Sequence, residues 1–196
     1  MVAHAIFTYG TLAFPGVMRA VTGRTFASRR AWVCGFARLR VRGVVYPGLL
    51  ETGGRCTDGR VYLGVDDQSL ARLDRFEDWL YERRVVEVVL LGGAARRVDA
   101  WVVPPHHASF LLRVPWDADR FVRRYLHRYL RGCRDFRRLD RVQNPACSND
   151  LQETSYGSED MDPSPEPRSS RSELASARYG EARPSWSTRC NACPRY

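Results

Sequence analysis

The apolar and polar positions at the start of the chain predict a strand, a glycine turn and a helix. Residues 5–9 form a short apolar run that ends at Gly10, which is typical of a buried strand. A helix is expected from about Phe14, because Pro15 suits a first turn and the apolar residues that follow recur at helical spacing. Gly23 is the expected end of this helix.

The next eighty residues or so are predicted to be mostly strands. Apolar positions alternate or run together in five stretches: 31–41, 44–46, 60–65, 81–91 and 97–103. Pro47-Gly48 indicates a turn after the second stretch, and Gly92-Gly93 joins the last two into a hairpin. Pro104-Pro105 is expected to close this β-rich part.

One helix interrupts the strands, and it carries an acid on its apolar face. Leu70, Leu73, Phe76 and Glu77 recur at the spacing of one helix face, and the polar residues 66–69 offer N-caps. Glu77 is therefore expected to point toward the core near the end of the helix.

This position predicts an unusual carboxyl group. Burial, the negative end of the helix and the nearby acid Asp74 all favour the protonated form of Glu77, so we expect its pKa to be raised. Arg83 and Arg84 are close enough in sequence to neutralise it instead. The residues alone leave two interpretations open: a carboxyl group kept for proton transfer, and a buried structural pair with arginine.

An amphipathic helix is predicted from Asp117 to about Cys133, laid against the sheet. Its polar face is mostly arginine, which we interpret as solvated surface. Its apolar stripe consists of Phe121, Val122, Tyr125, Leu126, Tyr129 and Leu130.

The composition changes after residue 140. Residues 141–196 hold ten serines, six of the eleven prolines and few aliphatic residues, so they cannot bury enough apolar surface to offset the cost of ordering. We predict one domain over 1–140 and a disordered tail over 141–196. Cys190 and Cys193 form a CxxC in that tail without the second ligand pair that a zinc site needs.

The formal net charge of +9 invites the hypothesis of a nucleic-acid partner. All 31 basic residues are arginines, however, which indicates a GC-rich coding sequence, and they are scattered through the predicted strands and helices. We therefore expect no nucleic-acid partner.

The six cysteines do not predict a disulfide framework. The chain begins with Met-Val-Ala-His and enters a strand pattern at once, without a signal peptide, and no apolar run approaches the roughly 20 residues of a membrane span. We expect a cytoplasmic protein without a membrane partner, in which Cys34 and Cys133 are unpaired thiols of the core or surface.

The turn Tyr9-Gly10-Thr11-Leu12 is a second candidate for chemistry. A glycine directly after a buried strand lets backbone N–H groups face outward, and a following helix adds its positive end, so the turn suits a carboxylate or phosphate group. By itself the pattern is more typical of an ordinary connection between a strand and a helix.

Taken together, several motifs resemble the gamma-glutamylcyclotransferase-like superfamily, and most closely its branch of avirulence-induced-gene-like proteins and gamma-glutamylamine cyclotransferases. The motifs are Tyr9-Gly-Thr-Leu12, Tyr46-Pro-Gly-Leu, Leu73-Asp-Arg-Phe-Glu77 and Tyr81-Glu-Arg83 followed by a valine-rich strand. Their order and spacing match over about residues 4–135. The resemblance implies an α+β fold: a small mixed β-barrel or curved sheet with flanking helices.

The resemblance also implies a reaction, the release of 5-oxoproline and a free amine from a γ-glutamyl amide. Glu77 corresponds to the general acid/base of the family, and the backbone of Tyr9, Gly10, Thr11 and Leu12 to the loop that binds the γ-glutamyl group. Tyr81 and Arg83 are further candidates for substrate binding. No metal or other cofactor is expected, the partner is a small γ-glutamyl molecule, and the protein is expected to be a monomer or homodimer.

Two other functions stay open on the sequence. A non-catalytic protein that binds a small molecule or a partner could use the same fold. An RNA-associated basic protein is a third hypothesis, for which salt-dependent RNA binding would be the mark.

Overall fold

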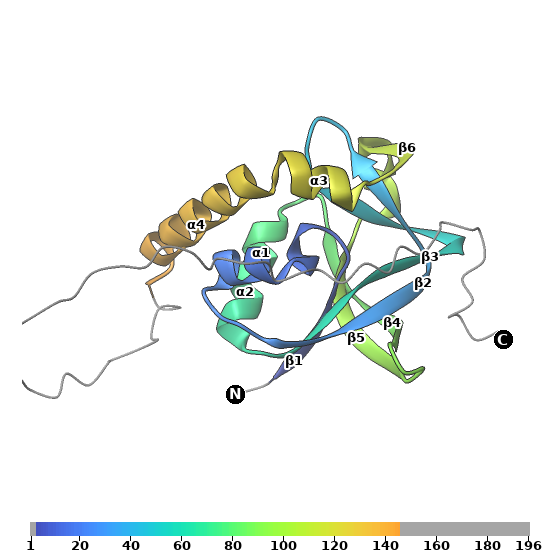
Figure 1. The fold of residues 1–196 in the computed structure, drawn as a ribbon, viewed down its shortest axis with the longest axis horizontal. Coiled ribbons are helices and arrows are strands. Elements are labelled where there is room, and N and C mark those ends of the chain that lie inside the picture. The colour runs from blue at the N-terminus through green and yellow to red at the C-terminus, as the bar shows by residue number, and fades with distance from the viewer. Residues whose placement is uncertain (1–2, 146–196) are drawn as a thin grey trace, which may run out of the picture. The chain divides into compact units, whose positions relative to one another are not determined.

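The computed structural model describes residues 3–145, which form a mixed sheet with short helices around it (Figure 1). The strands are β1 (His4–Thr8), β2 (Ala27–Val41), β3 (Pro47–Val65), β4 (Glu82–Leu90), β5 (Ala95–Val102) and β6 (Leu111–Pro115). The helices are α1 (Pro15–Thr22), α2 (Asp67–Glu77), α3 (Ala118–Arg124) and α4 (Leu126–Gln143), with 3-10 turns η1 (Thr11–Ala13) and η2 (Pro105–Phe110).

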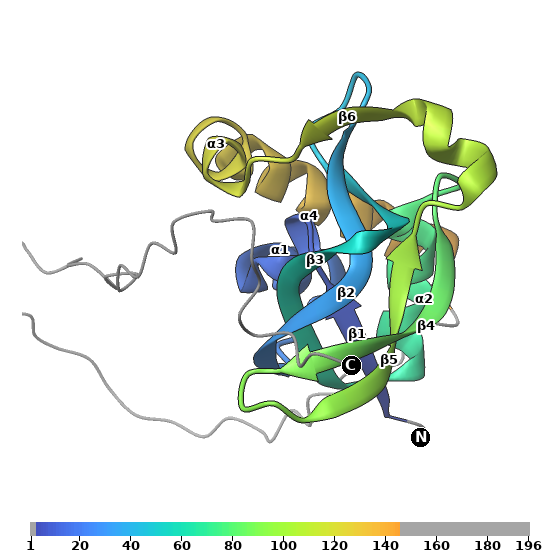
Figure 2. The ribbon, with the colours of Figure 1, turned by 90° about the vertical axis from the view of Figure 1, so that its right-hand side faces the viewer.

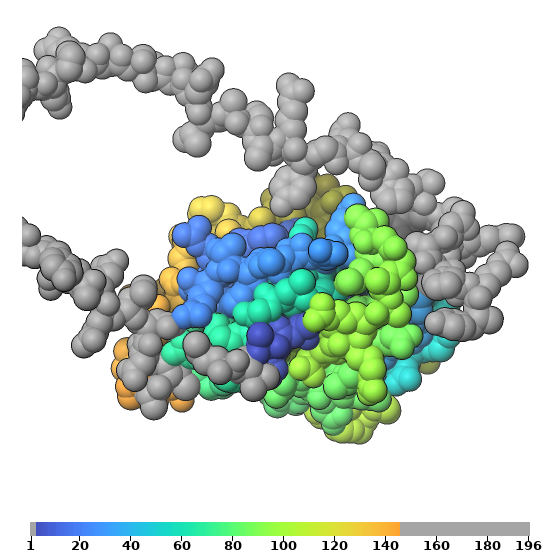
Figure 3. Space-filling model, turned by 90° about the horizontal axis from the view of Figure 1, so that it is seen from below, coloured from blue at the N-terminus to red at the C-terminus, as the bar shows by residue number. Residues whose placement is uncertain are grey.

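Five of the strands close into a barrel. Hydrogen bonding joins them in the order β3-β1-β5-β4-β2, and the long pairing of β2 with β3 completes the ring. All of these pairings are antiparallel except that of β1 with β5, so the barrel is mixed. Figure 3 shows β1 (dark blue) between the surface of β3 and that of the β4–β5 hairpin (green). The α+β barrel with flanking helices is therefore confirmed.

Successive side chains along the strands point to opposite faces of the sheet, and an apolar core forms on each face. On β1, Phe7 points into the barrel, where it packs with Val33, Leu49 and Val88. Its neighbour Ile6 points outward, to the apolar faces of the helices. Figures 1 and 2 show α1, α2 and α4 gathered on this side of the barrel. The helices therefore cover one outer face, and β1 lies between the two cores.

The connection between β2 and β3 corrects the sequence prediction. We expected Pro47-Gly48 to form a turn, but the turn lies at 42–46, where Gly43 has a φ of 78°, and β3 begins at Pro47. Proline is acceptable as the first residue of a strand because its missing N–H costs little there. The predicted strand 60–65 is the last part of the same long strand.

The sequence prediction also missed β6, which follows the two prolines and pairs with β2 at Val41 and Leu39. Only Leu111 of this strand is buried, and three of its five residues are exposed, so it lacks a strong alternating pattern.

The C-terminal helix is longer than predicted. It breaks at Tyr125 and then continues as α4 to Gln143, ten residues beyond the expected end near Cys133. The buried face continues through Cys133 to a charged residue, Asp140, which a search for apolar periodicity does not recognise. The predictions for the tail, including the pair Cys190 and Cys193, concern residues that lie almost wholly outside those described.

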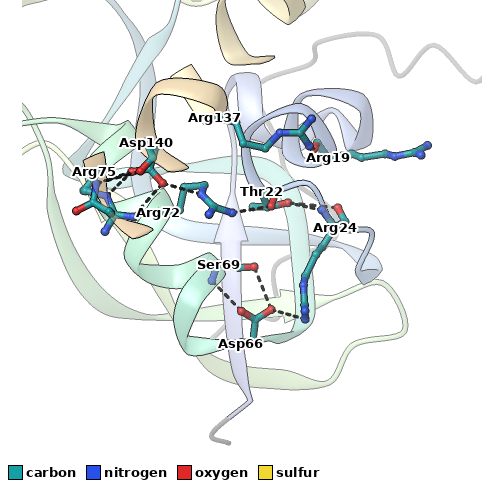
Figure 4. Close-up of polar contacts among 10 residues, drawn as sticks. Arg19, Thr22, Arg24, Asp66, Ser69, Arg72, Arg75, Arg137 and Asp140 are labelled. Atoms are coloured by element: carbon teal, nitrogen blue, oxygen red, sulfur yellow. Dashed lines mark hydrogen bonds and ion pairs between the residues drawn. The ribbon is translucent and has the colours of Figure 1, made fainter. Parts of the chain in front are cut away.

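A buried ion-pair network explains why an acid can lie on that face (Figure 4). Asp140 accepts hydrogen bonds from Arg72 Nε at 2.8 Å and from Arg75 Nε at 2.6 Å, both on α2. Arg72 also donates to the carbonyl of Thr22 at the end of α1 (2.8 Å). One carboxylate thereby ties α4 to α2, and one arginine ties α2 to α1.

The cysteines differ in part from the prediction. Cys133 is a buried free thiol, as expected. Cys34 was expected to be unpaired as well, which is wrong: it faces Cys56 across the β2–β3 ladder and forms a disulfide with it. The partners are 22 residues apart in sequence, and only the register of two long strands brings them together.

Among residues 3–145, no helix is long and apolar enough to cross a membrane.

Candidate active site

Glu77 is the last residue of α2, and the packing of that helix fixes its position. Asp66 caps the first turn by accepting a hydrogen bond from the backbone N–H of Ser69 (2.8 Å). Leu70 and Leu73 are buried against the outer face of the barrel. Asp78 then leaves the helix with a φ of 65°, which turns the chain away and leaves Glu77 at the edge of the helix layer.

A cavity of about 140 Å³ opens at this edge, and Glu77 lines it. The other lining residues come from the end of β1 and the following turn, from the start of β3, and from α2, β5 and α4. They are Phe7, Thr8, Tyr9, Gly10, Thr11, Leu12, Tyr46, Pro47, Phe76, Asp78, Tyr81, Trp101 and Tyr129. The two features that the sequence singled out, Glu77 and the turn 9–12, therefore face one cavity.

Hydrogen bonds to two of its carbonyl groups fix the turn after β1. Arg38 donates to the carbonyl of Tyr9 (2.9 Å), and the hydroxyl of Tyr62 donates to the carbonyl of Leu12 (3.1 Å). Residues 11–13 form the 3-10 turn η1, whose first N–H groups have no acceptor within the turn itself. No side chain caps this end of the turn, and Thr11 and Leu12 both line the cavity.

Glycine is required at position 10 because Pro47 lies against it. A Cβ atom built there would stand 2.7 Å from Cγ of Pro47 and 2.9 Å from its Cδ, closer than real contacts allow. The start of β3 therefore closes over the glycine turn, and the cavity owes its shape to this close approach.

Gly10→Ala is accordingly expected to push Pro47 away and to destabilise the fold. The predicted change is a loss of about 1–3 kcal/mol in the free energy of unfolding, measured by urea denaturation. Gly54→Ala is the matched control, because nothing lies within 4 Å of a Cβ atom at that position. Equal behaviour of the two variants would refute the proposed role of Gly10.

Hydroxyl groups from four elements surround the cavity. Tyr9 donates to the carbonyl of Trp101 (2.8 Å), and Tyr81 donates to the carbonyl of Pro47 (2.9 Å). The hydroxyl of Thr11 lies 3.2 Å from that of Tyr129 on α4. Burial raises the pKa of Tyr9, of Tyr81 and of Tyr129, so these phenols keep their protons and stay hydrogen-bond donors.

The Glu77 carboxyl has the perturbed proton affinity that the sequence indicated. Burial first, and the negative charge of Asp74 second, raise its pKa from about 4.5 to about 8. Within residues 3–145 no arginine forms an ion pair with it, since the two candidates bind elsewhere: Arg83 to Asp74 and Asp99, and Arg84 to Glu51. A buried Glu–Arg structural pair is therefore not what the structure contains.

Arg83, a candidate for substrate binding, is not among the residues that line the cavity. Its Nε lies 3.0 Å from Asp74 Oδ1 and its Nη1 3.6 Å from Asp99 Oδ2. Asp74 also accepts a hydrogen bond from Trp101 Nε1 (3.1 Å). Arg83 faces a neighbour of Glu77, so it acts on the carboxyl only through Asp74. Its spacing after Tyr81 could not reveal that β4 turns it toward Asp74 and Asp99.

Removal of the charge on Asp74 is expected to lower the pKa of Glu77. Asp74→Asn leaves burial as the remaining cause, so the pKa should fall below about 8 and stay above 4.5. The measurement is a pH titration of the Glu77 side-chain carboxyl carbon by NMR. Glu87→Gln, an exposed carboxyl on β4, is the control and should leave the titration unchanged. An unmoved midpoint in Asp74→Asn would contradict the electrostatic coupling.

Sequence reasoning left several residues that line the cavity unassigned, among them Trp101, Tyr129 and Asp78. Trp101 and Tyr129 belong to a strand and a helix that were predicted for packing alone, and they reach the cavity through tertiary structure. Asp78 follows Glu77 directly, but its left-handed backbone gave no signal in the sequence. Among residues 3–145, no three His, Cys, Asp or Glu side chains are grouped closely enough to hold a metal ion.

Comparisons with known proteins point to one family. Residues 6–118 match the family described as gamma-glutamyl cyclotransferase, AIG2-like. AIG2-like protein C of Arabidopsis thaliana is 40% identical over 88 residues, which are 45% of this chain and 51% of that protein. AIG2-like protein D of the same plant is 32% identical over 96 residues, 49% of this chain and 63% of that protein. The matches thus span about half to two thirds of the relatives' length.

A solved structure supports the same relationship. The solution structure of an Arabidopsis thaliana protein superposes with a TM-score of 0.52 at 25% identity and covers 81% of this chain and 94% of the other. A second solution structure from that plant, at 22% identity and a TM-score of 0.52, agrees in fold. The chain belongs to the gamma-glutamyl cyclotransferase, AIG2-like family.

Proposed function

We propose that the protein is a cyclotransferase that converts a γ-glutamyl amide into 5-oxoproline and a free amine, with Glu77 as general acid/base. The observation that carries the proposal is that one small cavity is lined both by the Glu77 carboxyl, whose pKa is raised to about 8, and by the glycine turn of residues 9–12. The family supports the same reaction class.

The reaction needs one proton acceptor and no other reagent. The Glu77 carboxylate takes a proton from the α-ammonium group of the substrate, and the freed α-amine attacks the γ-carbonyl carbon. A new C–N bond closes the five-membered ring while the bond to the leaving nitrogen breaks. Glu77 gives its proton to that nitrogen and takes up the second proton that the attacking nitrogen loses as the ring closes. This second proton passes to the departing amine, so the amine leaves as an ammonium ion and the carboxylate is regenerated.

The raised pKa of Glu77 suits this proton transfer. An ordinary glutamate of pKa about 4.3 is a poor base for an α-ammonium of pKa about 8, a mismatch of roughly 3.7 units or about 5 kcal/mol. A pKa of about 8 removes most of that gap. The compensating cost is that part of the enzyme holds a protonated Glu77 at neutral pH, so the rate should rise with pH up to about 8.

The neighbouring groups are suited to holding the glutamyl half of the substrate. The N–H groups at the start of η1 match the α-carboxylate or the γ-carbonyl oxygen, both of which accept hydrogen bonds. Thr11 and Tyr129 add hydroxyls on the same wall. Ring closure is intramolecular, so a cavity that folds the substrate toward its closing shape supplies a large part of the acceleration.

The direct test is incubation with a panel of γ-glutamyl amides at pH 8 and quantification of 5-oxoproline by mass spectrometry. Enzyme-dependent release that stops in Glu77→Gln supports the proposal, and release that survives this substitution removes Glu77 from its role. Saturable binding of 5-oxoproline without turnover of any amide would instead support a non-catalytic binding protein on this fold.

A further inference from the structure

The cavity is too small to hold a whole γ-glutamyl amide with a sizeable amine portion. Its volume of about 140 Å³ is well below the roughly 300–1,000 Å³ of sites that enclose drug-sized ligands. If the glutamyl half reacts beside Glu77, the amine half must lie at the mouth. The residues at the rim of the cavity therefore decide which amines are accepted.

The chain next to the rim carries an exposed aromatic cluster, which we define as Trp79, His107 and Phe110. Trp79 is 59% exposed and Phe110 is 41% exposed. The Trp79 ring meets the His107 ring edge-on at 5.2 Å and the Phe110 ring at 5.1 Å. Large apolar side chains that gather in solvent mark a binding surface, whereas single ones are ordinary.

This cluster is joined rigidly to the cavity. Trp79 follows Asp78, which lines the cavity, and its backbone N–H donates to Asp78 Oδ1 (2.6 Å). Leu80 is buried, and its carbonyl accepts a hydrogen bond from His107 Nδ1 (3.2 Å). Within residues 78–81, Asp78 and Tyr81 thus line the cavity, Leu80 is buried in the core, and Trp79 is the central ring of the cluster.

The backbone at Asp78 is held in a strained conformation. Its φ of 65° makes it the sole non-glycine residue with positive φ among residues 3–145. Such a conformation costs of order 1–3 kcal/mol and is found most often at functional sites. Here it turns the chain between Glu77, which lines the cavity, and Trp79, whose indole is exposed. The indole lies against His107 and Phe110 of η2. Figure 2 shows η2 as the coil between β5 and β6.

We infer that the aromatic cluster is the amine-side half of the substrate site and that it selects γ-glutamyl amides whose amine carries an aromatic ring. This inference rests on the proposed cyclotransferase reaction. An aromatic ring of the substrate gains from edge-to-face contact with Trp79 and Phe110 and from the apolar surface that these side chains now expose to water.

The test compares γ-glutamyl phenethylamide with γ-glutamyl ethylamide, because the two leaving amines differ in the ring but have the same primary alkylamine chemistry. We expect kcat/KM to be roughly tenfold or more higher for the phenethylamide, the lower end of what a few apolar groups contribute to discrimination. Trp79→Ala should remove this preference, because kcat/KM should fall much further for the phenethylamide than for the ethylamide. Phe110→Ala should reduce the preference in part.

Controls separate this inference from the proposed reaction. Leu139→Ala truncates another exposed apolar residue, on α4 and 56% exposed, and should keep the preference. Equal kcat/KM for both amides, or a preference that persists in Trp79→Ala, overturns the inference while the cyclotransferase stands. A higher kcat/KM for a γ-glutamyl 4-aminobutylamide would also overturn it, in favour of cation recognition. Absence of 5-oxoproline from every amide would overturn the proposed function and the inference with it.

Discussion

Glu77→Gln is expected to lower the rate of 5-oxoproline formation by about 10²–10⁴-fold, the range that a general acid/base contributes. Glutamine keeps the length of the side chain and its hydrogen-bonding capacity, but it cannot accept and return a proton. The measurement is kcat/KM with a small γ-glutamyl amide between pH 6 and pH 9. Wild-type kcat/KM should rise with pH toward about 8, and the residual rate of the variant should lack this rise.

The stability of the same variant separates a chemical defect from a folding defect. The pKa of Glu77 is about 8 in the folded protein and about 4.5 in an unfolded chain, so between these values the folded state holds the extra proton. Wild-type stability therefore falls as the pH rises from about 4.5 to about 8, because the folded state must give up a proton that the unfolded state has already lost. Glutamine has no such proton, so Glu77→Gln should be at least as stable as the wild type at pH 9.

Two outcomes would count against this account. Loss of activity together with loss of stability at pH 9 would show that Glu77 is a structural residue. A wild-type pH profile retained by the variant would show that the titrating group is another one. Glu87→Gln removes an exposed carboxyl of the same kind and should change neither the rate nor the alkaline stability.

Local pattern was sufficient to single out two features that the structure places on one cavity, and the family resemblance supplied their joint role. The helix face that carries Glu77 and the turn 9–12 are both short-range features, and the structure places both on one cavity. The raised pKa followed from burial beside Leu73 and from Asp74 one turn away, and these are the causes found in the structure. The position of Glu77 beside Leu73 and Asp74 depends on the spacing of residues along a helix, which can be read directly from the sequence.

The contacts that the sequence did not reveal depend on how distant elements pair. Cys34 meets Cys56 only through the register of β2 and β3, and Tyr129 meets Thr11 only because α4 lies beside the turn. Arg83 was close to Glu77 in sequence, yet β4 directs it to Asp74 and Asp99. In each case the deciding contact is tertiary, and a one-dimensional pattern contains no information about it.

Asp140 is another charged residue whose role the apolar pattern of the sequence did not show. Of the substitutions predicted here, its replacement should cause the largest loss in the free energy of unfolding. Asp140→Ala is expected to lower the free energy of unfolding by about 3–5 kcal/mol, the cost of breaking a buried ion pair. Arg72 is 3% exposed and Asp140 is 4% exposed, so the alanine leaves the guanidinium buried without its carboxylate. The measurement is urea denaturation, with the midpoint lowered and the slope unchanged.

A surface pair in the same helix provides the matched control. Asp135 faces Arg138 at 3.4 Å, with both side chains largely exposed, and Asp135→Ala should cost at most about 1 kcal/mol. Replacement of both buried partners, Arg72→Met with Asp140→Leu, should recover most of the loss, because no unpaired charge is then left inside. Equal effects of Asp140→Ala and Asp135→Ala would refute the claim that the buried pair fixes α2. If the claim holds, the same carboxylate on α4 keeps in place the helix that ends in Glu77, and the proposed general acid/base depends on a residue that lies outside its cavity.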